Sequence, residues 1–124
     1  MFEIEVEERN GRPQAIIVER KRGISSWVRL GPVSLGIFLE SLNQCIKEEK
    51  AGKWERGWKE NGRSYSLVRD ENRAGCFLRL GVMDLEMKRY SIFILKGRGE
   101  RGGWFSMVEM LREMGVVTGR KESK

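Results

Sequence analysis

The chain of 124 residues contains no histidine, and Asp70 and Asp84 are its only aspartates. The absence of histidine removes most zinc-site designs and the side chain that most often serves as a general base. A catalytic site would have to be assembled from Glu, Lys, Ser or Tyr, and no local pattern of these residues indicates one. We therefore predict a protein that is not an enzyme, with no catalytic residue, no metal and no cofactor.

Cysteine is scarce and long apolar runs are missing. Cys45 and Cys76 lack metal-ligand spacing and are too few for a secreted disulfide framework, so we expect two buried, reduced thiols of an intracellular protein. No apolar run approaches the roughly 18 residues that would span a bilayer. No signal peptide opens the chain, which agrees with an intracellular location.

Positive charge is what the chain has in excess. It carries 24 Lys and Arg against 18 Asp and Glu, a net charge of +6. Residues 53–103 hold 12 Lys and Arg against 7 Asp and Glu, a surplus of 5, whereas residues 1–52 hold equal numbers. This balance favours an anionic partner, usually nucleic acid or an anionic membrane surface. The alternative is that the charge serves only solubility.

The sequence repeats itself. FEIEVEERNGRPQAIIVE from Phe2 matches SYSLVRDENRAGCFLRLG from Ser64, since each is an alternating run, a polar turn and a second alternating run. SSWVRLG from Ser25 matches YSIFILKG from Tyr90, and each is followed by an amphipathic helix pattern. We predict a single α+β domain, residues 1–124, with repeat one at 1–50, repeat two at 53–117 and a polar tail at 118–124.

Each repeat is expected to be a set of antiparallel strands backed by one helix. The expected strands are 2–8, 14–21, 25–30, 54–59, 63–69, 76–82 and 88–96, and the expected helices are 33–48 and 104–114. Asn-Gly at 10–11 and 61–62 predicts type I′ hairpin turns. The order is β-β-β-α and then β-β-β-β-α. The first repeat lacks an opening strand, so either the chain is truncated near Met1 or this repeat has degenerated.

The second unit resembles the PUR (purine-rich element binding) repeat and, in topology, the Whirly proteins. The stretch NRAGCFLRL from Asn72 resembles the turn and strand that open the nucleic-acid-facing hairpin of a PUR repeat. A strand and a helix of suitable length follow it. The resemblance implies two intertwined repeats that bind single-stranded DNA or RNA on curved sheets backed by helices. For such a protein the nucleus is the expected compartment, with an organelle as the alternative.

The candidate binding residues are aromatic and basic side chains that share a strand face. In 76–82, Phe77 and Arg79 lie opposite the apolar set that begins at Cys76, and we expect them to face away from the helix. An exposed ring can stack on a base while a guanidinium binds a phosphate. The full expected set is Trp27, Arg29, Trp54, Arg56, Trp58, Arg73, Phe77, Arg79, Lys96, Arg98 and Arg101. The alternative is that these aromatics fill the interface between the repeats.

Residues 97–102 read Gly-Arg-Gly-Glu-Arg-Gly, a literal dinucleotide-binding fingerprint. We reject that interpretation because no parallel strand with a following acidic residue has room after it. The predicted function is therefore single-stranded nucleic-acid binding, without a membrane partner and with a second copy of the chain as a further candidate partner. The alternative is a protein-interaction or dimerisation module with a basic surface.

Overall fold

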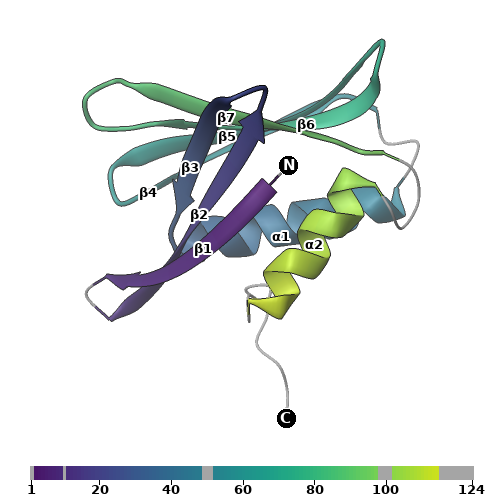
Figure 1. Cartoon of the computed structure of the whole chain (residues 1–124). Coiled ribbons are helices and arrows are strands. Elements are labelled where there is room, and N and C mark those ends of the chain that lie inside the picture. The colour runs from purple at the N-terminus through teal and green to yellow at the C-terminus, as the bar shows by residue number, and fades with distance from the viewer. Residues whose placement is uncertain (1, 10, 49–51, 98–101, 115–124) are drawn as a thin grey trace.

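The computed structural model describes residues 2–9, 11–48, 52–97 and 102–114. The fold is α+β, with two antiparallel sheets and two helices, which confirms the predicted class and element order. The elements are β1 (Phe2–Arg9), β2 (Arg12–Lys21), β3 (Ile24–Leu30), α1 (Pro32–Lys47), β4 (Trp54–Glu60), β5 (Arg63–Asn72), β6 (Gly75–Met83), β7 (Arg89–Leu95) and α2 (Gly103–Glu113). Figure 1 shows both helices on one side of the second sheet.

Sheet A consists of β1, β2 and β3 in that order, and neighbouring strands are antiparallel. Ile4, Ile17 and Val28 lie opposite one another in the register, and all three are buried. Arg22 and Gly23 have φ of 54° and 81°, the left-handed conformation at both positions that a tight hairpin turn requires. Strand alternation therefore gives sheet A one buried face.

Sheet B consists of β4, β5, β6 and β7 in that order. Asn61 and Gly62 have φ of 54° and 79°, so the predicted Asn-Gly turn joins β4 to β5. In β6 the apolar set Leu78, Leu80 and Val82 is buried, which confirms the predicted alternation in this strand.

The helices supply the rest of the core. α1 begins at Pro32, whose fixed φ and missing N–H suit a first helical turn. At the spacing of an amphipathic helix, α1 buries Leu35, Phe38, Leu39 and Leu42, and α2 buries Trp104, Met107, Val108 and Leu111. Phe105 is only half-buried, whereas Trp104 is 1% exposed. Trp104 Nε1 donates to the Ile94 carbonyl oxygen at 2.8 Å, which anchors α2 to sheet B.

The two repeats are joined at the N-terminus of α1 by Glu60 of β4. Glu60 Oε1 accepts from the Ser34 backbone N–H at 2.8 Å, and Oε2 accepts from that of Val33 at 3.1 Å. This carboxylate satisfies free helix N–H groups and complements the helix dipole. Gly31 makes the approach possible, since a Cβ there would lie 2.6 Å from Glu60 Oε2. The second repeat therefore caps the helix of the first.

The two cysteines differ in burial. Cys45 is buried and free, and its burial raises the pKa of the thiol although the Arg69 charge opposes the rise. Cys76 is also free but only half-buried, contrary to the expectation that both would be buried, because it lies near the start of β6. Within the described residues, neither helix is long and apolar enough to cross a membrane.

Candidate nucleic-acid interface

One side of sheet B faces away from both helices, and we call it the open face. The opposite side, the covered face, packs on α1 and α2, and none of the described elements lies over the open face (Figure 1). The register of the four strands places on the open face Glu55, Gly57, Lys59, Ser64, Ser66, Val68, Asp70, Phe77, Arg79, Gly81, Met83, Arg89, Ser91, Phe93 and Leu95. Phe77 and Arg79 thus face away from the helices, as predicted.

Two phenylalanines lie side by side on the open face. The ring centroids of Phe77 and Phe93 are 5.6 Å apart, with 54° between the ring planes. Phe93 is 48% exposed and Phe77 is half-buried. Arg79 is exposed and lies opposite Phe93 in the β6–β7 register. The open face therefore joins an aromatic surface to a cation, the combination that single strands use for stacking and phosphate contact.

A cavity of about 500 Å³ borders these rings where sheet A meets the edge of β7. The end of β2 contributes Glu19 and Lys21 to its lining, beside Phe77 and Phe93. Glu19 Oε1 accepts from the Phe93 backbone N–H at 3.3 Å, so the two sheets are linked at this edge. Polar groups of sheet A consequently stand next to the aromatic pair of sheet B.

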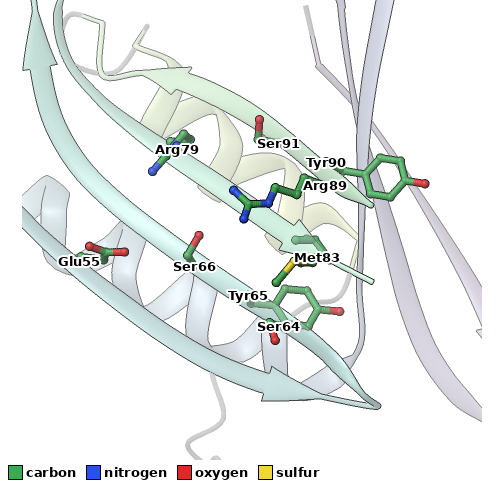
Figure 2. A pocket seen from close by; sticks show the side chains of 11 residues that line it. Glu55, Ser64, Tyr65, Ser66, Arg79, Met83, Arg89, Tyr90 and Ser91 are labelled. Carbon is green, nitrogen blue, oxygen red and sulfur yellow. The ribbon is translucent and has the colours of Figure 1, made fainter. Parts of the chain in front are cut away.

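A second cavity of about 350 Å³ crosses the open face, and we call it the trough. Four small residues face one another in register across the strands: Gly57, Ser66, Gly81 and Ser91. The adjacent rows carry longer side chains, among them Glu55, Arg79, Met83 and Arg89. Figure 2 shows Ser66, Ser91 and both arginines among the side chains that line the trough.

The trough arginines have no acidic partner in the described part of the chain. Neither Arg79 nor Arg89 forms an ion pair or a side-chain hydrogen bond with a described residue. Arg29 on sheet A differs, because its Nη1 lies 2.7 Å from Glu7 Oε2 and its side chain is only 19% exposed. An unpaired guanidinium keeps its attraction for an incoming anion, whereas a paired one must first exchange its partner.

Trp27 and Arg29 occupy the outward side of β3, as expected, but only Trp27 is accessible. Trp27 is 40% exposed, and its ring centroid lies 4.9 Å from that of Tyr90 on β7. The pair bridges the two sheets. Arg29 is engaged by Glu7, so the guanidinium two residues from Trp27 would have to leave this carboxylate before it could bind a phosphate.

Trp54, Arg56 and Trp58 share one face of β4, as expected, and that face is the covered one. Trp54 and Trp58 pack against the core, and Arg56 Nη1 donates to Ser41 Oγ of α1 at 3.1 Å. The placement corrects the sequence-based grouping of these three with Phe77. They fit the alternative that the aromatics fill the interface between the repeats.

Trp58 belongs to a polar network between the repeats. Its Nε1 donates to Ser34 Oγ at 2.9 Å, and its ring stacks on Tyr65 at 5.5 Å with 1° between the planes. Burial raises the pKa of the Tyr65 phenol, although a hydrogen bond with Ser34 and the nearby Arg63 charge oppose the rise. The protonated hydroxyl donates to the Arg29 carbonyl oxygen at 3.1 Å. This network ties β4 and β5 to the first repeat.

The remaining residues of the expected binding set do not gather at one place in the structure. Arg73 is exposed in the turn between β5 and β6. Lys96 is half-buried with Nζ 5.8 Å from the Trp104 ring centroid, so it contacts α2 rather than the open face. Arg98 and Arg101 lie outside the described residues.

Arg89 and Phe93 are open-face residues that were missing from the expected set. The signal was present, because Ile92 and Ile94 form the apolar alternate of β7 and therefore direct their neighbours outward. Their positions relative to Arg79, with Phe93 directly opposite it and Arg89 opposite Met83, depend on the β6–β7 register, which alternation does not give.

A scan against protein-family models finds no match for this chain, and a search of curated proteins finds no similar sequence. Within the described residues, no three His, Cys, Asp or Glu side chains gather in a way that could hold a metal ion. The candidate site is therefore defined by geometry and charge.

Proposed function

We propose that this protein binds single-stranded DNA or RNA on the open face of sheet B. The observation that carries the proposal is the contact between Phe77 and Phe93 beside Arg79, on a sheet face where no described residue pairs with Arg79 or covers the rings. Stacking on exposed rings contributes about 1–3 kcal/mol per base and requires bases that are not already paired. The excess of Lys and Arg in residues 53–103 supports the same partner.

The class of protein and its cellular compartment follow from the same proposed function. We propose a binding module rather than an enzyme, related to the PUR repeat, because the four-strand-and-helix order of the second repeat is the order that this resemblance implies. An intracellular location, in the nucleus or in an organelle, follows if the partner is a cellular single strand.

A protein-interaction module is the second candidate, and exposed apolar side chains favour it. Phe93 and Leu95 on β7 are 48% and 45% exposed, so the open face offers a partner protein some apolar area. A second copy of this chain is one such partner. The two functions differ in their response to salt, because phosphate contacts release counterions and apolar contacts do not.

The test is fluorescence anisotropy with labelled single-stranded DNA, single-stranded RNA and blunt duplex over a range of salt concentrations. With about four phosphates engaged, we expect a log–log salt slope near −3 and tighter binding of single strands. A slope near zero, or a preference for duplex, would favour the interaction module. Light scattering at the same protein concentrations would then report whether the partner is a second copy.

A further inference from the structure

We propose, on the basis of the single-strand function above, that the trough is a phosphodiester subsite. The sugar–phosphate backbone crosses sheet B through it, roughly perpendicular to the strands, with a phosphate held between Arg79 and Arg89. This assigns a path to the bound strand and separates backbone contacts in the trough from base contacts at Phe77 and Phe93.

The trough has the shape of a path across the sheet. Its lining draws on all four strands, from Glu55 of β4 through Ser66 and Gly81 to Ser91 of β7. Gly81 keeps the floor low, since even a Cβ there would lie 3.0 Å from Ser66 Oγ. A depression that crosses a whole sheet suits a chain that enters at one edge and leaves at the other.

The walls of the trough carry hydrogen-bond donors that suit a phosphate. Arg79 and Arg89 lie on opposite sides of the small-residue row, because Arg79 is opposite Phe93 and Arg89 is opposite Met83 in the register. Ser66 and Ser91 add hydroxyl donors between them (Figure 2). Guanidinium groups bind phosphate oxygens through paired N–H donors, and hydroxyls can complete the shell.

Charge is distributed unevenly along the trough. Both arginines lie toward β6 and β7, whereas Glu55 lines the β4 end. A carboxylate repels a phosphate, so the phosphate contact that contributes most to binding is expected at the β6–β7 end. Phe93 is next to Arg79 there, which allows a base to stack beside its own bound phosphate.

The test compares two oligo-dT single strands of equal length, one with natural linkages and one with alternate neutral methylphosphonate linkages. The proteins are the wild type, the double variant Arg79→Gln/Arg89→Gln and the trough-filling variant Ser91→Leu. Ser106→Leu is the matched control for Ser91→Leu, and Arg112→Gln shows the effect of removing one positive charge elsewhere. Both are at exposed positions of α2, away from the trough. Circular dichroism melts establish that each variant is folded.

We expect the double variant and Ser91→Leu to bind the natural strand about tenfold or more weakly, because the first loses two charge-assisted contacts and the second fills the trough. The controls should change binding about twofold or less, as expected for remote surface positions. Neutral linkages should weaken binding by the wild type and have a much smaller effect on the double variant. This coupling between the arginines and the linkage charge would show that the arginines bind phosphate. If Ser91→Leu does not fold, the linkage comparison decides the question alone.

Two results would overturn the proposal. If the neutral linkages cost the double variant as much as the wild type, the arginines do not hold the phosphate. If folded Ser91→Leu binds like Ser106→Leu, the strand does not occupy the trough. In either case single-strand binding by the wild type would stand, and the strand would follow another surface. A wild type that binds neither strand would instead remove the function and the subsite together.

Discussion

β4 and β6 carry the same sequence signature and use it in opposite ways. Each strand has an arginine two residues from an aromatic side chain: Arg56 beside Trp54 and Trp58 in β4, and Arg79 beside Phe77 in β6. In β4 this set lies on the covered face and contacts α1, whereas in β6 it lies on the open face.

The difference follows from what stands at the alternate positions. The alternates of β6 include Leu78, Leu80 and Val82, which are more apolar than Phe77 with Arg79 and therefore take the core side. The alternates in β4 are Glu55, Gly57 and Lys59, so the tryptophans are the only apolar set that the strand can bury. An aromatic–arginine pair is left on the open face, where it could contact a partner, only if a more apolar set occupies the other face.

The largest effect expected from this contrast is on stability. Trp58→Ala should lower the free energy of unfolding by about 3 kcal/mol, since it removes a large ring from the core and leaves the Ser34 hydroxyl without its donor. Urea unfolding would measure the loss. Trp58→Phe is the control, because it keeps a ring against Tyr65 and loses only the Nε1 donor, so its cost should be nearer 1 kcal/mol.

If Trp58→Ala instead kept its stability and lost nucleic-acid affinity, the two strands would be equivalent after all. The contrast between the covered and the open face would then fail for β4, and Trp58 would belong to the nucleic-acid interface.

Local signals predicted much of the fold. The Asn-Gly turn at Asn61–Gly62, the stripe of α1 and the alternation in β6 each depend on residues close together in the chain, and all three are present. Applied to β4, the rule that the more apolar alternate faces inward would also have placed Trp58 correctly. Trp58 was placed wrongly because an aromatic side chain two residues from an arginine does not by itself mark an exposed binding surface.

Other features depend on contacts that the sequence does not encode locally. The cap that Glu60 places on α1 joins residues 26 or more positions apart, and the row that includes Ser66 and Gly81 exists only in the register of sheet B. The pairing of Arg29 with Glu7 likewise joins distant strands and removes a cation that the sequence offered for binding. Predicting these contacts requires strand order and register rather than alternation.

The next effect concerns binding with little change in stability. Phe77→Ala should weaken single-strand binding by roughly 1–3 kcal/mol if a base stacks there. Because Phe77 is half-buried on the open face, the melting temperature should fall far less than in Trp58→Ala. Anisotropy titrations and thermal melts of the same preparations would provide both numbers. Should Phe77→Ala unfold the domain while binding per folded molecule stays unchanged, Phe77 is a core residue and the open face has been misassigned.

The smallest effect, and the most direct comparison of the two strands, is in the salt dependence. Arg79→Ala should reduce the magnitude of the log–log salt slope by about one unit, because one phosphate contact is lost. Arg56→Ala removes the same charge from the covered face, where the guanidinium bonds to Ser41, and should leave the slope unchanged. Both variants lower the net charge equally, so a difference between them reports position rather than total charge. Equal slopes for Arg56→Ala and Arg79→Ala would mean that the strand is attracted by the overall field of the protein, and that the open face holds no phosphate of its own.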